Sequence, residues 1–279
     1  MNGTVVYKMN GSGNDFVFVD GRTSPLSAWT PERIRAVCDR HSGVGSDGLV
    51  VVEPGSAPDA VRFHFFNSDG GRAAMCGNGA LCATRIAAYL ELASPNGMTL
   101  ETDAGTYRSR CVPGDGERAE LLLGDVTAFS QPKVRLRSGE REARLVQVGV
   151  PHLVVLVEKV GAVELLERGR ALRFDPALGP PGANVNFVGP AEGHSGTQAW
   201  AMRTYERGVE GETLACGTGA VACASVLALG GHATLPLQVR TASGKVLSVS
   251  GAPTGSGVCG VSLAGEGRLL FRAILGDVG

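Results

Sequence analysis

The order of apolar and polar residues predicts many short strands and few helices. Thr4–Asp20 alternates as a strand pair does, broken at residues 11–15, and apolar runs predict buried strands at 49–52 and 61–66. A helix is predicted over Ser27–Arg40, with Thr30 as its N-cap. After residue 97, short strands are predicted around 98–102, 111 and 121–123.

The second half of the chain repeats this order. Residues 146–157 predict a strand pair interrupted by Pro151 and His152, a helix follows over 160–172, and strands are expected at 183–188 and 200–205. A similar order in both halves predicts an internal duplication. We expect one half to span residues 1–127, with the tail 266–279 able to pack back on it, and the other to span 128–265.

Two helices stand out because they have almost no polar face. Gly77–Leu90 carries Arg85 as its only charged residue, and Gly217–Leu229 carries none. A helix that is apolar all round must be buried on every side. The predicted fold is therefore α+β, with two pseudo-symmetric halves. Each half is a mixed, largely antiparallel, barrel-like sheet around a buried central helix, and the active-site cleft is expected between them, where ligand sites often form.

Composition narrows the class of protein. The chain has 279 residues, 19% charged residues and a net charge of −1, which provides no long-range field for nucleic acid. No apolar run is long enough for a membrane span, and the first residues lack the pattern of a signal peptide. We therefore expect a cytoplasmic protein that binds neither nucleic acid nor membrane. The spacing of its seven cysteines fits neither a zinc site nor a secreted disulfide framework.

Each apolar helix is preceded by the same chemistry. Cys76 stands before Gly77-Asn78-Gly79, and Cys216 stands before Gly217-Thr218-Gly219, about half the chain away. The start of a helix attracts anions and favours a thiolate. Two such ends could hold one carboxylate and place a sulfur on each face of the attached carbon. That arrangement suits inversion by two acid/base groups, one removing the α-hydrogen and the other returning a proton.

The same cysteine stretches allow three alternative interpretations. A single cysteine before Gly-x-Gly is more often a packing residue than a catalyst. Each glycine-rich helix start could also bind phosphate, although the P-loop and dinucleotide motifs are absent. A Cys–His nucleophile could use His41, His64 or His152, but it would leave one of the two cysteines unexplained. His64, inside an apolar strand, is interpreted as a packing residue.

Several motifs occur in order along the chain: Gly13–Phe16, Arg40–Asp47, Phe66–Gly70, Cys76–Ala80, Asn184–Phe187, Tyr205–Gly208 and Glu212–Gly219. Over essentially the whole chain they resemble the diaminopimelate epimerases, a family of cofactor-independent amino acid epimerases. The resemblance implies inversion of one α-carbon of LL-2,6-diaminopimelate to the meso form, without cofactor or metal. It also suggests a homodimer.

The resemblance assigns a role to individual residues. Cys76 and Cys216 would be the acid/base pair, and the backbone amides around Gly77-Asn78 and Gly217-Thr218 would hold the reacting carboxylate. The remaining residues would position the amino acid substrate, the last four of them at or near its distant end: Asn14, Asn67, Asn184, Glu206 and Arg207. Arg207 suits a carboxylate and Glu206 an ammonium. Without the motif, Glu206 and Arg207 would be interpreted as a surface ion pair.

Two positions depart from the family pattern. Gly48 stands where glutamine is usual, and Val150 stands where asparagine is usual before Pro151-His152. Neither change affects the cysteine pair, but Val150 removes an amide expected to touch the distal end of the substrate. A racemase of another amino acid on the same scaffold is therefore one alternative. A non-catalytic amino acid-binding protein is another.

Overall fold

A computed structural model describes residues 3–191 and 199–276, and the chain divides into two compact units. The first unit comprises Met1–Leu122 and Ala264–Gly279, and the second comprises Leu123–Leu263. Within the described residues, no helix is long and apolar enough to cross a membrane.

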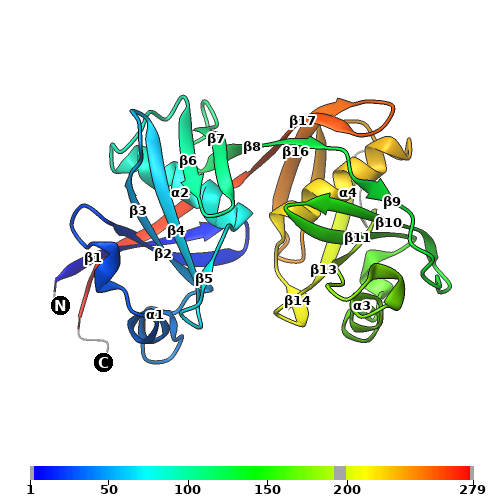
Figure 1. The fold of residues 1–279 in the computed structure, drawn as a ribbon, viewed down its shortest axis with the longest axis horizontal. Coiled ribbons are helices and arrows are strands. Elements are labelled where there is room, and N and C mark those ends of the chain that lie inside the picture. Colours follow the sequence, from blue (N-terminus) through cyan, green and yellow to red (C-terminus); the bar gives the residue numbers. More distant parts are fainter. Residues whose placement is uncertain (1–2, 192–198, 277–279) are drawn as a thin grey trace. The chain divides into compact units, whose positions relative to one another are not determined.

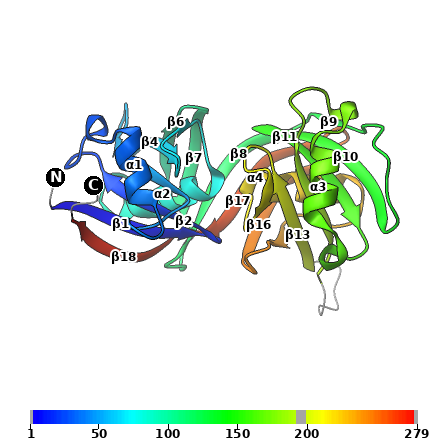
Figure 2. The same ribbon diagram turned by 90° about the horizontal axis from the view of Figure 1, so that it is seen from below.

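The first unit consists of a sheet and two α-helices (Figure 1). Its helices are α1 (Pro31–Cys38) and α2 (Gly77–Tyr89), with a short 3-10 helix at Leu26–Ala28. Its strands are β1 (Thr4–Gly11), β2 (Asn14–Asp20), β3 (Gly48–Pro54), β4 (Ala60–Asn67), β5 (Arg72–Ala73), β6 (Met98–Thr102), β7 (Gly105–Cys111), the start of β8 (Arg118–Val126) and β18 (Arg268–Leu275). The C-terminal strand β18 returns to lie antiparallel to β1, as Figure 2 shows.

The second unit repeats these elements. Its helices are α3 (Leu165–Arg173) and α4 (Gly217–Leu229), with 3-10 helices at Val160–Ala162 and Pro176–Leu178. Its strands are β9 (Phe129–Ser130), β10 (Glu140–Val148), β11 (Val150–Val157), β12 (Asn184–Pro190), β13 (Ala199–Glu206), β14 (Gly211–Thr213), β15 (Leu237–Arg240), β16 (Val246–Pro253) and β17 (Val258–Glu266).

Strand pairing has the same order in both units. In the first unit, β2 runs parallel to β3 and β4 parallel to β6, while β1–β2, β3–β4, β4–β5 and β6–β7 are antiparallel. In the second unit, β11 runs parallel to β12 and β13 parallel to β15, while β10–β11, β12–β13, β13–β14 and β15–β16 are antiparallel. The predicted α+β class with two similar, largely antiparallel halves is confirmed.

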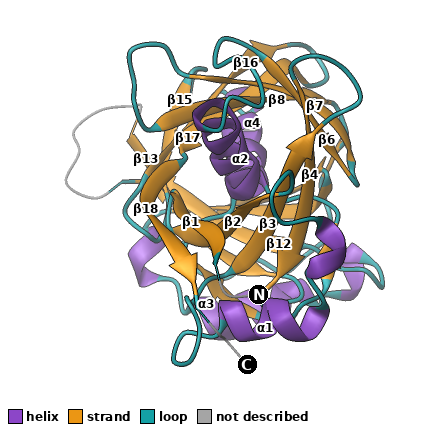
Figure 3. Cartoon of the chain, turned by 90° about the vertical axis from the view of Figure 1, so that its left-hand side faces the viewer, coloured by secondary structure: helices purple, strands orange, loops and turns teal. Residues whose placement is uncertain are grey.

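The two apolar helices are buried, as their lack of charge predicts. In the second unit, every α4 side chain position from Gly219 to Leu227 is buried, against strands β10–β13, β15 and β16. In the first unit, α2 packs against β1–β4, β6, β7 and β18, and Figure 3 shows helices enclosed by strands. The one charge on α2, Arg85, reaches out to donate to the carbonyl of Gly116.

Some predicted boundaries are wrong for local reasons. Within the predicted range Ser27–Arg40, the Thr30 N-cap is confirmed: the helix begins at Pro31, and the Thr30 hydroxyl accepts a hydrogen bond from Arg33 N–H at 3.4 Å. The helix ends at Cys38 rather than at Arg40. Proline suits the first helical position because it lacks an N–H group. The turn predicted at Pro151-His152 lies instead at Gly149, whose φ of 67° favours glycine. Pro151 and His152 therefore belong to β11. The helix predicted over 160–172 is a short 3-10 turn followed by α3.

Candidate active site

In the first unit, Cys76 is the N-cap of α2. Its backbone is extended (φ −137°, ψ 121°), and its half-buried sulfur accepts a hydrogen bond from the N–H of Gly79 at 3.4 Å. The next N–H groups, those of Gly77 and Asn78, belong to the first helical turn, which has no intrahelical acceptors to offer them. This end of α2 can therefore stabilise negative charge on the sulfur and on a nearby anion.

A chain of hydrogen bonds leads from α2 to the loop before β3. The Nδ2 of Asn78 donates to Oδ1 of Asn14 at 2.7 Å, and the Nδ2 of Asn14 donates to Oδ2 of Asp47 at 3.0 Å. Asn78 is almost fully buried, whereas Asn14 is half-buried at the start of β2. The structure thus brings three predicted residues, Asn14, Cys76 and Asn78, to one corner of the first unit. Asp47, which accepts the hydrogen bond from Asn14, was not predicted as a site residue.

Ion pairs hold the segments that carry Asn14 and Asp47. Arg40 forms ion pairs of 2.7 Å with both Asp15 and Asp47, and the buried Lys8 pairs with Asp15 at 2.6 Å. Burial alone would raise the pKa of Asp15, but hydrogen bonds from Arg40 and Lys8 outweigh it and lower the pKa. The loop containing Asp47 is therefore fixed by ionised groups.

Asn67 lies at the exposed end of β4, in the turn where its N–H donates to the carbonyl of Gly71 at 2.8 Å. Opposite it in the sheet is Gly48. A Cβ atom at Gly48 would stand 2.5 Å from the carbonyl oxygen of Phe66 and 2.7 Å from the ring of Phe65. The space that a side chain at position 48 would enter is therefore filled, which gives a physical reason for glycine there.

In the second unit, Cys216 is the N-cap of α4 and is 7% exposed. Its sulfur lies 3.7 Å from the hydroxyl of Thr218. A Cβ atom at Gly219 would stand 3.1 Å from this sulfur and 2.4 Å from Oδ1 of Asn186. The first turn of α4 therefore lies directly against β12, and only glycine leaves room for both neighbours.

Three predicted residues lie where β12 begins and β13 ends. Oδ1 of Asn184 accepts a hydrogen bond from the backbone N–H of Arg207 at 2.8 Å. The carboxylate of Glu206 accepts one from the hydroxyl of Thr213 at 2.7 Å, and burial raises its pKa. Glu206 and Arg207, both within the described residues, form no ion pair with each other. The alternative of a surface ion pair is therefore wrong.

A buried polar cluster next to these residues contains His152, which was considered from the sequence only as a partner for a cysteine nucleophile. His152 is fully buried, and its Nδ1 lies 3.2 Å from Nδ2 of Asn186, whose Oδ1 accepts from Thr204 at 2.9 Å. Burial first, and then the charge of Arg207, lowers the pKa of His152 to about 3. The imidazole is therefore neutral. The pairing of His152 with Asn184 across parallel strands could not be obtained from the sequence without the turn at Gly149.

The other cysteine in each of the helices α2 and α4 is fully buried, unlike Cys76 and Cys216 at the helix starts. Burial raises the pKa of Cys82 in α2 and of Cys223 in α4, so both remain thiols. His64 is also buried, between Glu53 at 3.1 Å and Arg72 at 3.0 Å, in agreement with its interpretation as a packing residue.

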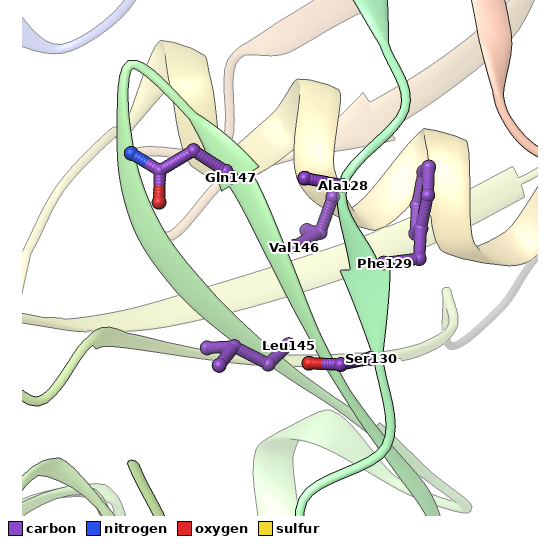
Figure 4. A pocket seen from close by; sticks show the side chains of 6 residues that line it. All are labelled: Ala128, Phe129, Ser130, Leu145, Val146 and Gln147. Carbon is purple, nitrogen blue, oxygen red and sulfur yellow. The ribbon is translucent and has the colours of Figure 1, made fainter. Parts of the chain in front are cut away.

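A shallow pocket lies elsewhere on the second unit. It has a volume of about 230 Å³ and is lined by residues of β9, β10 and the chain just before β9: Ala128, Phe129, Ser130, Leu145, Val146 and Gln147 (Figure 4). None of them is a predicted site residue, and their side chains include no charged group.

Comparison with known proteins identifies relatives over nearly the whole chain. The family model described as diaminopimelate epimerase matches residues 6–128 and 144–255. A diaminopimelate epimerase of Gemmatimonas aurantiaca is 46% identical over 276 residues, covering 95% of this chain and 96% of the relative. One from Aquifex aeolicus is 41% identical over 252 residues, covering 87% and 88%.

Solved structures share the fold at low identity. A PhzF-family phenazine biosynthesis protein of Bacillus anthracis has a TM-score of 0.70 at 14% identity and covers 98% of this chain and 99% of its own. A probable proline racemase of Agrobacterium radiobacter, with bound carbonate, has a TM-score of 0.66 at 18% identity, covering 97% and 92%. These structures support the fold, whereas the sequence matches cover both cysteine stretches. The chain belongs to the diaminopimelate epimerase family.

Proposed function

We propose that this protein inverts one α-carbon of LL-2,6-diaminopimelate to give the meso isomer, using Cys76 and Cys216 as its two acid/base groups and no cofactor. The observation that carries the proposal is the family match, which spans both cysteine stretches. In support, each cysteine is the N-cap of a buried helix. The product would serve as a precursor of lysine and peptidoglycan.

The proposed chemistry follows from the helix ends. One sulfur, as a thiolate, removes the α-hydrogen, and the other, as a thiol, donates a proton to the opposite face of the carbon. Backbone N–H groups of Gly77, Asn78, Gly217 and Thr218 hold the carboxylate, where negative charge develops in the transition state. Such preformed donors stabilise that charge without reorganisation.

We assign the remaining predicted residues to substrate positioning. Asn14 contributes a polar group near α2, while Asn67, Asn184, Glu206 and Arg207 serve the distal amino acid group. A guanidinium can bind a carboxylate through two hydrogen bonds, and a carboxylate can neutralise an ammonium. The raised pKa of Glu206 reflects burial, and an arriving ammonium would offset it.

A racemase of another amino acid is the second candidate, because Gly48 and Val150 depart from the family pattern. The filled space at Gly48 excludes a longer side chain there, and Val150 provides no amide. A panel of LL-diaminopimelate and single-centre amino acids, analysed by chiral chromatography, separates the two candidates. Inversion of a single-centre amino acid with no turnover of diaminopimelate would favour the second.

The cysteine roles are tested by substitution with matched controls. Cys76→Ala and Cys216→Ala should each abolish inversion, because each removes one of the two proton-transfer groups. Cys82→Ala and Cys223→Ala change cysteines of the same helices whose thiols are buried, and these variants should retain activity. Turnover by either Cys76→Ala or Cys216→Ala would remove the mechanism. Tight binding of diaminopimelate by the unaltered protein without inversion would identify a non-catalytic binding protein instead.

A cytoplasmic location and a homodimeric state are part of the same proposal. The strand β18 supports assembly, because its side chains Leu270, Phe271 and Ile274 are large, apolar and exposed. Light scattering on the purified protein measures the assembly state, and a monomer at all concentrations would contradict the homodimer.

A further inference from the structure

The loop before β3 contains an acidic residue whose contacts point to a role in the reaction. Asp47 is half-buried, and its two carboxylate oxygens have different partners. Oδ1 accepts from Arg40 at 2.7 Å, and Oδ2 accepts from the side-chain amide of Asn14 at 3.0 Å and from the backbone N–H of Asp15 at 3.2 Å. Its own N–H donates to the carbonyl of Asp15 at 2.9 Å, so the residue is held at both its main chain and its side chain.

These contacts impose a direction on the neighbouring amides. An ionised carboxylate is an acceptor only, so Asn14 must turn its Nδ2 toward Asp47. The Oδ1 of Asn14 then faces Asn78 and accepts a hydrogen bond from its Nδ2 at 2.7 Å. With Asn14 reversed, its oxygen would face the carboxylate and its nitrogen would face a second nitrogen. Both contacts would be repulsive, so one orientation is strongly preferred.

The orientation of the Asn14 side-chain amide determines whether it presents a hydrogen-bond donor or an acceptor to a ligand. In the observed orientation one Nδ2 hydrogen is bound to Asp47, and the second remains as a donor on a half-buried side chain. A carboxylate needs donors. The reversed amide would present an oxygen to it instead, and the hydrogen bond would be lost.

We infer that Asp47 is a positioning residue that keeps Asn14 turned as a hydrogen-bond donor toward the carboxylate of an amino acid ligand. The inference rests on the proposed function, because that function places a ligand carboxylate at this corner of the first unit. Asp47 itself touches no reacting atom. A carboxylate on the protein thus prepares a site for a second carboxylate by acting through an amide between them.

The alternative is that Asp47 only anchors its loop through Arg40 and Asp15, and a pair of variants separates the two roles. Asp47→Asn has nearly the same shape, but its amide can donate or accept, so it no longer dictates the orientation of Asn14. Arg40→Gln removes the ion pairs that tie the loop and leaves the carboxylate of Asp47 in place.

We expect Asp47→Asn to raise KM for LL-diaminopimelate roughly tenfold with kcat within about twofold, because it weakens a hydrogen bond present in both the bound substrate and the transition state. Arg40→Gln should lower the temperature of unfolding and leave KM close to that of the unaltered protein. An unchanged KM in Asp47→Asn would overturn the inference. An equal rise in both variants would also overturn it, because loop anchoring would then account for the effect.

A second measurement does not depend on turnover. In the ¹⁵N-labelled protein, with the side-chain signal of Asn14 assigned by its loss in Asn14→Ala, one Nδ2 proton should exchange slowly with solvent. The same protection should persist in Arg40→Gln and disappear in Asp47→Asn. Rapid exchange of both protons in the unaltered protein would refute the orientation. If the protection pattern holds but the protein inverts no diaminopimelate, the proposed function fails and the role of Asp47 in orienting Asn14 stands.

Discussion

Substituting the second glycine of each cysteine motif should have opposite effects in the two units. Gly79→Ala and Gly219→Ala add the same methyl group at equivalent positions, three residues after Cys76 and Cys216. In the first unit, the added Cβ would stand 3.4 Å from both the Cβ of Cys76 and the ring of Phe63, an ordinary contact distance. In the second, it would stand 2.4 Å from Oδ1 of Asn186.

The expected magnitudes follow from these distances. Alanine inside a helix stabilises by about 0.5–1 kcal/mol relative to glycine, which is the whole effect expected at position 79. At position 219, Asn186 cannot move away easily, because it is fully buried and bonded to Thr204 and next to His152. Overpacking of this kind costs about 1–3 kcal/mol, and losing a buried hydrogen bond adds about 1–3 kcal/mol. After the helical gain of alanine is subtracted, we expect Gly219→Ala to lower the free energy of unfolding by about 1–5 kcal/mol.

Urea unfolding followed by circular dichroism measures both variants against the unaltered protein. A midpoint shift to higher urea for Gly79→Ala and to lower urea for Gly219→Ala is the predicted pair of results. Gly219→Ala with unchanged or increased stability would refute the reasoning, since it would mean that α4 does not press against Asn186 as described.

Two further predictions concern buried groups. The pKa of His152 is lowered to about 3 in the folded protein. Between about pH 6.5 and pH 3, this histidine therefore binds a proton in the unfolded chain but not in the folded one. The free energy of unfolding should fall with pH over this range, by at most about 1.4 kcal/mol per pH unit from this residue. Urea unfolding at pH 7 and pH 5 should therefore show a smaller pH dependence in His152→Gln, and an equal dependence would contradict the assigned neutral imidazole. Gly48→Gln should lower the free energy of unfolding by about 1–3 kcal/mol, because Phe65 and the carbonyl of Phe66 fill the space. Gly97→Gln, at a glycine with no atom within 4 Å of the added Cβ, is the control, and equal stability of both variants would show that position 48 has room.

The fold was predictable where burial leaves a strong pattern. A helix without charge, such as Gly217–Leu229, has to be enclosed, and the repetition of that helix indicated the division into two similar halves. Local boundaries were less predictable, because proline and glycine act differently according to their neighbours. Pro151 looked like a turn residue, yet it pairs with Gln147 inside the strand pair, and the turn is made by Gly149.

The motifs identified the candidate residues of the site. The structure places Asn78 within hydrogen-bond distance of Asn14, next to Cys76 in the first unit, and Asn184 within hydrogen-bond distance of Arg207 in the second. The roles assigned to these residues stay predictions. Residues that hold the candidate site residues in place, such as Asp47, were not predicted, because their contacts join segments that are distant in the sequence. Asp47 lies within the Arg40–Asp47 motif, but its hydrogen bond to Asn14 joins the loop before β3 to β2. Single-sequence reasoning has no access to such pairs before the parallel register of β2 and β3 is known.

The central claim is that two cysteines exchange protons with opposite faces of one carbon, and isotope incorporation tests it most directly. LL-diaminopimelate is incubated with the protein in deuterated water, and product and remaining substrate are separated during the first turnovers. A thiol carries one exchangeable proton, so the group that removes the α-hydrogen cannot supply solvent deuterium to the same face before it exchanges. We predict meso product with deuterium at the inverted carbon and remaining substrate that retains its hydrogen. Product that keeps the original hydrogen would contradict the two-cysteine account.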